Sequence, residues 1–173
     1  MIHEVLPIIA DELNDYLETK FDTAEDPVIL SNILNQDGTI AIREENKIVI
    51  NLINIERDGS NPLGSGIVGG GEMPIHVNLY VLFSAYFTNY FEGLKFLSGV
   101  IGFFQLNPSF LIDGEDIKVE LYNVDFREIS NIWAGLGAKY LPCVMFKIRT
   151  LSMDDDRVND ETPPVSGSII DND

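Results

Sequence analysis

Cysteine and histidine are scarce in this chain of 173 residues, and each scarcity excludes a class of site. The single cysteine, Cys143, cannot form an internal disulfide, so nothing indicates an oxidising compartment. It lies in an apolar run over residues 141–146, where a small buried side chain is expected and a reactive thiol is not. The two histidines, His3 and His76, are far apart in the sequence, and neither has the spacing of a metal site.

Positive charge is also in short supply. The chain has 11 Lys and Arg residues against 28 Asp and Glu residues, which gives a net charge of -17. Such a chain repels nucleic acid and anionic membranes, so neither is expected as a partner. It suits a basic protein partner, although an acidic surface can also serve solubility alone.

Hydrophobic runs long enough to cross a bilayer are absent from the sequence. The longest apolar stretch, residues 96–104, is far shorter than the ~20 residues that span a membrane. The N-terminus carries His3 and Glu4 in place of the basic start and cleavage site of a signal peptide. We therefore expect synthesis in the cytoplasm without a targeting signal.

A glycine-rich stretch matches a cofactor motif by its letters but not by its context. Residues 64–69, Gly-Ser-Gly-Ile-Val-Gly, fit the dinucleotide fingerprint. That fingerprint must open a helix whose N-terminus meets the pyrophosphate, whereas here further glycines, Pro74 and an expected strand follow. We interpret residues 58–74 as a loop and expect no cofactor.

An acidic stretch resembles a calcium loop and fails in the same way. Asp154, Asp156 and Asp160 suggest calcium at first sight, but Asn159 occupies the position of the required glycine and Val165 that of the bidentate glutamate. No serine lies in a nucleophile elbow, and no histidine is near Cys143 in the sequence. Carboxylates are plentiful, yet no spacing pairs them in a cleft. We expect no catalytic, cofactor or metal site, although geometry assembled from distant residues is invisible in a sequence.

Apolar spacing predicts an α+β fold: a single domain with a mixed β-sheet and packed helices. Residues 75–87 alternate like a strand, and the residues after them recur at helical spacing until Asn107 and Pro108 end the helix. One predicted strand face holds Ile75, Val77, Leu79, Val81 and Phe83, and the predicted helical stripe holds Tyr90, Leu94, Leu97, Ile101 and Phe104. The other expected elements are helices over 2–19 and 126–136 and strands over 27–34, 46–55, 117–123 and 140–151.

Three details of this pattern are open to direct test. Pro7 favours a first-turn position, so the first helix could begin there. Trp133 lies on the apolar face of the last helix and is expected in the core, with Gly137 as C-cap. Residues 1–151 form the expected domain, and residues 152–173, with seven acidic residues and one arginine, are expected to be a disordered acidic tail.

Four segments together resemble one family. They are residues 51–56, residues 78–108, the run Ile-Ser-Asn-Ile-Trp-Ala-Gly-Leu-Gly over 129–137, and residues 139–149. In this order they are similar to the cap, or tail-terminator, proteins of phage-tail-like contractile injection systems of the antifeeding-prophage type. The resemblance spans roughly residues 2 to 151, and the glycine-rich loop and the acidic tail depart from it.

The resemblance implies a non-enzymatic, phage tail-terminator-like ring of about six copies. Such a ring closes the distal end of the inner tube, joins the end of the sheath, ends polymerisation and helps to hold the sheath extended. The implied partners are further copies of the chain, the inner tube protein and the sheath protein. The implied place is the bacterial cytoplasm, in a particle that can be released from the cell. Two other classes stay open: an acidic adaptor or chaperone that binds a basic protein, and a hydrolase with a hidden site.

Overall fold

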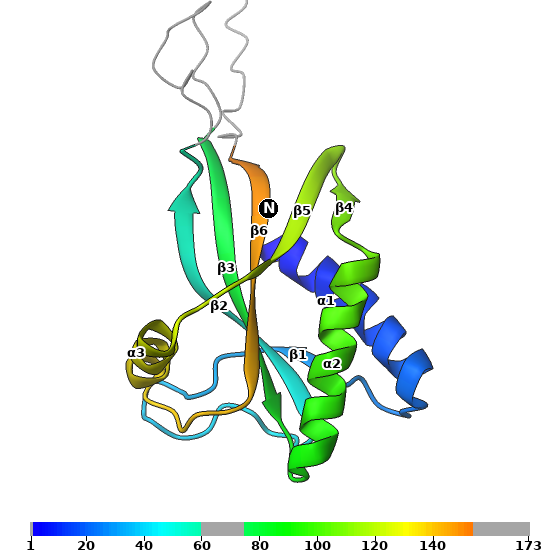
Figure 1. Ribbon diagram of the computed structural model, residues 1–173, viewed down its shortest axis with the longest axis vertical. Coiled ribbons are helices and arrows are strands. Elements are labelled where there is room, and N and C mark those ends of the chain that lie inside the picture. Colours follow the sequence, from blue (N-terminus) through cyan, green and yellow to red (C-terminus); the bar gives the residue numbers. More distant parts are fainter. Residues whose placement is uncertain (1, 60–74, 154–173) are drawn as a thin grey trace, which may run out of the picture.

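A six-stranded mixed sheet forms the centre of the fold (Figure 1). The computed structural model describes residues 2–59 and 75–153. The strand order is β1 (Val28–Leu30), β2 (Lys47–Arg57), β3 (Ile75–Tyr86), β6 (Cys143–Met153), β5 (Glu115–Tyr122) and β4 (Ser109–Ile112). Only β1 and β2 are parallel, and the other neighbours pair antiparallel. With α1 (Ile2–Phe21), α2 (Tyr90–Leu106) and α3 (Phe126–Leu136), this confirms the predicted α+β class and its mixed sheet.

The two faces of the sheet carry separate hydrophobic clusters, because side chains alternate along each strand. Phe83 points into a cluster with α1 and α2, and the next residue back, Leu82, points into a cluster with α3 and the segment before β2. In Figure 1, α1 and α2 accordingly lie on one flank of the strands and α3 on the other. The strand face predicted for residues 77–83 is confirmed, whereas Ile75 at its start is 51% exposed.

The face of α2 that meets the core differs from the predicted stripe. Leu97 and Phe104 are buried as predicted, but Tyr90, Leu94 and Ile101 are 68%, 38% and 42% exposed. The buried side chains are instead Phe96, Leu97, Val100, Phe103 and Phe104. The helix is apolar on almost every side, so spacing alone could not fix which side faces the sheet. The prediction of one buried stripe was wrong, and apolar side chains remain on the outside.

The ends of the helices follow local capping chemistry. The Asn89 side chain accepts hydrogen bonds from the amides of Phe91 and Glu92 and so begins α2. Asp125 and Glu128 form a reciprocal capping box at α3, and Gly137, at φ 68°, ends it as predicted. The alternative start of α1 at Pro7 was wrong, since the helix begins at Ile2 and holds Pro7 inside. Burial of Val5 and Leu6 helps to offset the backbone hydrogen bond that proline lacks.

Three strand predictions need correction. The strand predicted over 27–34 is confined to β1, because the following residues turn away and bury Ile33 and Ile42 beneath α3 as a loop. β4 was missed, although Asp113 and Gly114, both at positive φ, form the tight turn of the β4–β5 hairpin. β6 continues to Met153, two residues into the predicted tail. The rest of that tail lies outside the described residues.

Two glycines of α2 differ in the space around them, which yields a matched prediction. A Cβ on Gly99 would lie 2.6 Å from Leu17 Cδ2 and 2.9 Å from Phe21 Cε2, where α1 and α2 meet. A Cβ on Gly102 would meet nothing closer than 3.6 Å. We expect Gly99→Ala to lower the free energy of unfolding by about 1–2 kcal/mol through overpacking. Gly102→Ala should raise it by about 0.5–1 kcal/mol through helix propensity. Urea unfolding of both variants decides this, and equal shifts would contradict the close helix contact.

Candidate functional site

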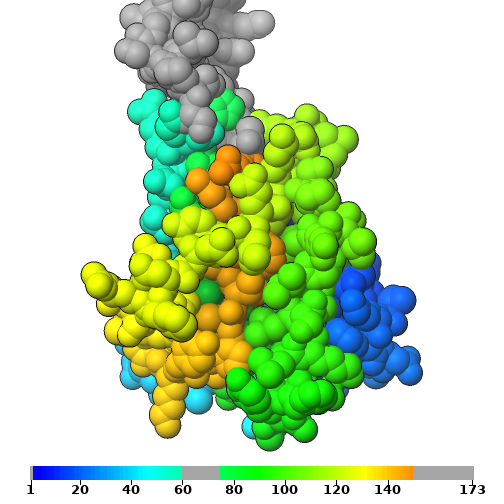
Figure 2. Space-filling view, in the orientation of Figure 1, coloured from blue at the N-terminus to red at the C-terminus, as the bar shows by residue number. Residues whose placement is uncertain are grey.

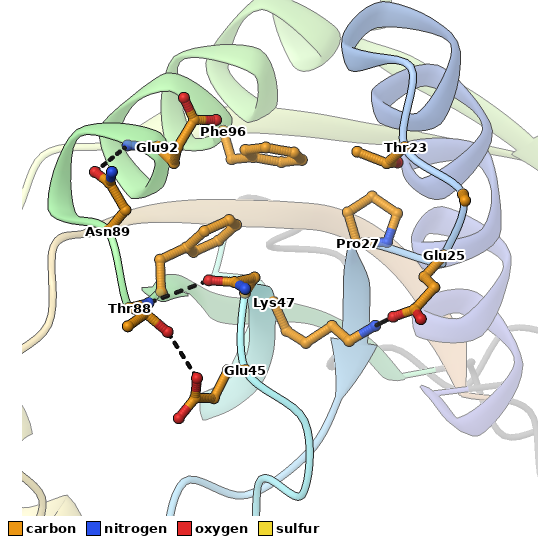
Figure 3. Close-up of a pocket in the computed structure, with 12 residues that line it drawn as sticks. Thr23, Glu25, Pro27, Glu45, Lys47, Thr88, Asn89, Glu92 and Phe96 are labelled. Atoms are coloured by element: carbon orange, nitrogen blue, oxygen red, sulfur yellow. Dashed lines mark hydrogen bonds and ion pairs between the residues drawn. The ribbon is translucent and has the colours of Figure 1, made fainter.

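A pocket of about 930 Å³ opens where three loops meet at one end of the sheet (Figure 3). The loop after α1, the residues that lead into β2 and the turn between β3 and α2 each contribute one wall. Its lining residues are Thr23, Ala24, Glu25, Pro27, Glu45, Asn46, Lys47, Phe87, Thr88, Asn89, Glu92 and Phe96. These residues are distant in sequence, so the pocket exists only in the folded chain.

Lys47 is the best-anchored polar side chain of this pocket. Only 4% of the residue is exposed, so its ammonium needs acceptors within the protein. Its Nζ donates to the backbone oxygen of Asp26 at 2.7 Å. The same Nζ lies 3.0 Å from Glu44 Oε2 and 3.9 Å from Glu25 Oε2. Figure 3 shows its side chain reaching across the pocket wall toward Glu25. The ammonium is therefore held by acceptors of this chain and is not available as a free nucleophile.

Hydrogen bonds around Thr88 fix the opposite wall (Figure 3). The Thr88 amide donates to Asn46 Oδ1 at 3.1 Å, and its hydroxyl donates to Glu45 Oε2 at 2.7 Å. One residue on, Asn89 caps α2. These hydrogen bonds hold the turn between β3 and α2 against the residues before β2, and they fix the position of this wall of the pocket.

The chemistry of the lining favours a cation over an anion. Three carboxylates, those of Glu25, Glu45 and Glu92, line the pocket together with Phe87 and Phe96, whose ring centroids lie 4.9 Å apart. Glu25 and Glu92 already pair with Lys47 and Lys95 of this chain. A lysine or arginine side chain of a partner could meet carboxylates and aromatic faces there at once. No histidine or cysteine is among the lining residues. The arrangement can hold a basic side chain, and it offers no nucleophile with an adjacent base.

Neither histidine of the chain lines this pocket, nor does Cys143, and the carboxylates that the sequence leaves without a site are spread over the fold. Glu45 lines it, its neighbour Glu44 pairs with Lys47, and Glu120 pairs with Arg149 at 3.0 Å on β5 and β6. His3 lies on α1 and His76 on β3. Within residues 2–59 and 75–153, no three His, Cys, Asp or Glu side chains are placed to hold a metal ion. The fingerprint-like run over 64–69 and the calcium-like run over 154–165 lie outside the described residues.

Cys143 is half-buried beside the second hydrophobic cluster, which is less burial than its apolar surroundings predict. Burial raises the pKa of its thiol. No helix in the described part of the chain has the length and apolar character needed to cross a membrane.

Sequence reasoning missed Lys47, although a signal was present. A lysine at the start of an otherwise apolar strand must either reach solvent or find buried acceptors. Acidic residues precede Lys47 at positions 25–26 and 44–45. Their spacing in the sequence does not show that Glu25 and the start of α2 lie close to Lys47 in the folded chain. The pocket therefore follows from tertiary structure and from no local motif.

Lys47 gives a second testable prediction. Lys47→Ala removes both the hydrogen bond to Asp26 and a buried four-carbon stem, and should lower the free energy of unfolding by about 2–3 kcal/mol. Lys47→Met keeps the stem, so it should lower the free energy by only about 1 kcal/mol. As a control, Lys139→Met, at an exposed position, should change it by less than about 0.5 kcal/mol. Thermal unfolding checks all three, and equal effects of Lys47→Met and Lys47→Ala would contradict the role of the stem.

Comparison with known proteins gives one family match and two similar structures. The family model described as the Pvc16 N-terminal domain matches residues 4–167. The anti-feeding prophage cap, a tube-terminating cap, is 15% identical with a TM-score of 0.50 over 92% of this chain and 60% of that one. The sheath/tube terminator of an extracellular contractile injection system, in its extended state, is 17% identical with a TM-score of 0.48 over 96% of this chain and 64% of that one. Among curated protein sequences, no relative was found.

These matches bear on fold and family to different degrees. At 15% identity, the similarity to the anti-feeding prophage cap shows a shared fold. The chain spans about 60% of the length of that protein, so the activity of the whole protein is not carried over with the fold. The family match covers most of the chain and is the stronger finding.

Proposed function

Because the chain belongs to the Pvc16 N-terminal domain family, we propose that it is a structural cap of a contractile injection system. In this role a ring of about six copies closes the distal end of the inner tube and joins the end of the sheath. The ring ends polymerisation and stabilises the extended sheath. Assembly takes place in the bacterial cytoplasm, and the finished particle can be released.

One observation carries the proposal: the family match from residue 4 to 167 coincides with a fold shared with a tube-terminating cap. The resemblance first noted in four separate segments of the sequence is thereby confirmed at the level of the family. The surface adds support, because α2 presents large apolar side chains that a solitary chain would leave in water. In a subunit of a larger assembly, such a surface can be buried in an interface.

A tube-end binding experiment tests the proposal directly. Purified chain carrying a small gold label is mixed with preformed inner tubes and imaged by negative-stain electron microscopy. We expect label at one tip of each tube, saturating at a fixed number of copies per tip. Label distributed along the tube wall, or no label on tubes at all, would contradict capping. Since a chain of net charge -17 associates faster with a basic surface, the association rate should fall with added salt.

A second candidate, an acidic adaptor or chaperone for a basic protein, is supported by the pocket around Glu25, Glu45 and Glu92. The two functions differ in where the chain ends up. A cap stays in the finished particle, whereas a chaperone leaves after assembly. Quantitative mass spectrometry of purified particles distinguishes them: a constant copy number in each particle supports the cap, and absence from particles supports the chaperone.

A further inference from the structure

An unusual surface runs along the outside of α2, and we name it the outer ridge. Its exposed large apolar side chains are Tyr90, Phe91, Leu94, Ile101 and Leu106, with exposed fractions between 38% and 73%. Only two of the 17 residues of the helix are charged, and these two, Glu92 and Lys95, pair with each other at 3.3 Å. In a chain of net charge -17, the ridge is therefore an apolar surface without net charge.

A concave surface of matching character lies between α3 and the sheet, and we name it the α3 groove. It encloses about 400 Å³, and its apolar and aromatic lining residues are Ile53, Tyr80, Tyr122, Val124, Ile132 and Met145. Tyr80 and Tyr122 meet edge to face with ring centroids 4.9 Å apart. An aromatic groove of this kind accommodates the apolar side chains of a helix.

The two carboxylates of the groove are already engaged within the chain. Glu56 Oε2 accepts a hydrogen bond from the Tyr80 hydroxyl at 2.5 Å and lies 3.9 Å from Lys147 Nζ. Glu128 accepts from the amide of Asp125 at 3.3 Å as part of the capping box. A neutral helix that enters the groove therefore meets one carboxylate with a cation nearby and one that is hydrogen-bonded to the backbone, which lowers the cost of desolvating them.

The ridge and the groove face opposite sides of the molecule. α2 packs on the first hydrophobic cluster and α3 on the second, so the sheet separates them. Figure 2 shows α2 (green) along one flank of the surface and α3 (yellow) along the other, with β6 visible between them. Two different complementary surfaces on opposite sides permit a head-to-tail contact, which closes into a ring when the rotation between copies suits.

We infer that the outer ridge of α2 in one copy of this chain packs into the α3 groove of the next copy. The inference rests on the proposed ring and names the surfaces that would build it. A second copy is the occupant because one chain carries both complementary surfaces, an apolar ridge without net charge and an apolar aromatic groove. Copies repel each other except where neutral surfaces meet, and the ridge has no net charge. A contact of ridge with ridge would leave the groove empty and would stop at a dimer.

Two variants, each altering one surface of the full chain, test this contact. Ile101→Glu places a charge on the ridge, and Asn131→Arg places a bulky charged side chain in the groove from an exposed position of α3. Matched controls are Ile8→Glu on α1, where the side chain is 37% exposed, and Ser130→Arg, an exposed position outside the groove lining. Thermal unfolding verifies that every variant is folded, and light scattering after size exclusion measures mass.

The expected result is a pattern that only a head-to-tail contact produces. Wild type and both controls form a species several times 19.3 kDa, whereas Ile101→Glu and Asn131→Arg each run at 19.3 kDa. An equal mixture of these two variants restores one intact contact and gives a pair of about twice 19.3 kDa. A mixture that stays monomeric, or single variants that keep the wild-type mass, would overturn the inference. Neither outcome would contradict the proposed cap function, which the tube-end binding experiment tests separately. A wild-type chain that stays at 19.3 kDa at its highest soluble concentration would also overturn it.

Discussion

Replacing Trp133 with alanine should lower the free energy of unfolding by about 3–5 kcal/mol, among the largest effects of any single substitution in this chain. Trp133 is 4% exposed, which confirms its predicted place in the core, and it is the only residue of α3 that is fully buried. Its ring packs 5.7 Å from that of Tyr140. The other apolar side chains of α3 that pack on this cluster, Ile129, Ile132 and Leu136, are only partly buried, so loss of the indole should weaken the attachment of α3 more than any other change in the helix.

Chemical denaturation followed by far-ultraviolet circular dichroism measures this effect. Phe126→Ala, at a position of the same helix that is 95% exposed, is the matched control and should change the free energy by less than about 0.5 kcal/mol. A near-neutral result for Trp133→Ala would place Trp133 at a contact surface and would contradict the second hydrophobic cluster.

The first hydrophobic cluster should be equally sensitive at Phe104. This residue is 3% exposed and lies within 4.4–6.3 Å, centroid to centroid, of four other phenylalanine rings. Phe104→Ala removes the centre of that group and should lower the free energy of unfolding by about 3–5 kcal/mol. Three residues earlier on the same helix, Ile101 is 42% exposed, so Ile101→Ala should lower it by about 1 kcal/mol at most.

This pair of substitutions also tests how α2 is rotated on the sheet. The stripe predicted from the sequence would bury Ile101 and Phe104 alike and would make the two substitutions similar in effect. The structure buries only Phe104. Comparable losses of stability for both variants, measured by urea unfolding, would contradict the observed rotation and with it the outer ridge.

Helix ends could be predicted from the sequence because they depend on a few neighbouring residues. α3 has the predicted bounds, since Asp125, Glu128 and Gly137 specify its start and its end locally. The rotation of α2 could not be predicted, because which of its apolar sides is buried depends on α1 and on the sheet. Residues such as Gly99 decide it, by letting α1 approach closely.

Strand length and the pocket could not be predicted from the sequence either, because both depend on contacts between distant residues. Ile33 and Ile42 are apolar enough for a strand, yet they are buried in a loop under α3. The pocket joins residues as distant as Glu25, Lys47 and Glu92, and the α3 groove joins Ile53 to Ile132. No local pattern records such distances. The family resemblance could be seen because it rests on the order of several segments, and it pointed to assembly before any contact surface was known.

The distribution of tube lengths in a strain that lacks the gene tests the central claim most directly. Lengths of tubes and sheaths are measured by electron microscopy in the deletion strain, in the parent and in the deletion strain supplied with the gene on a plasmid. We predict tubes of uncontrolled length or unstable particles in the deletion strain, and parental length and stability after complementation. Particles of normal length and stability in the deletion strain, in the absence of a substituting paralogue, would contradict the assignment of this chain as a cap.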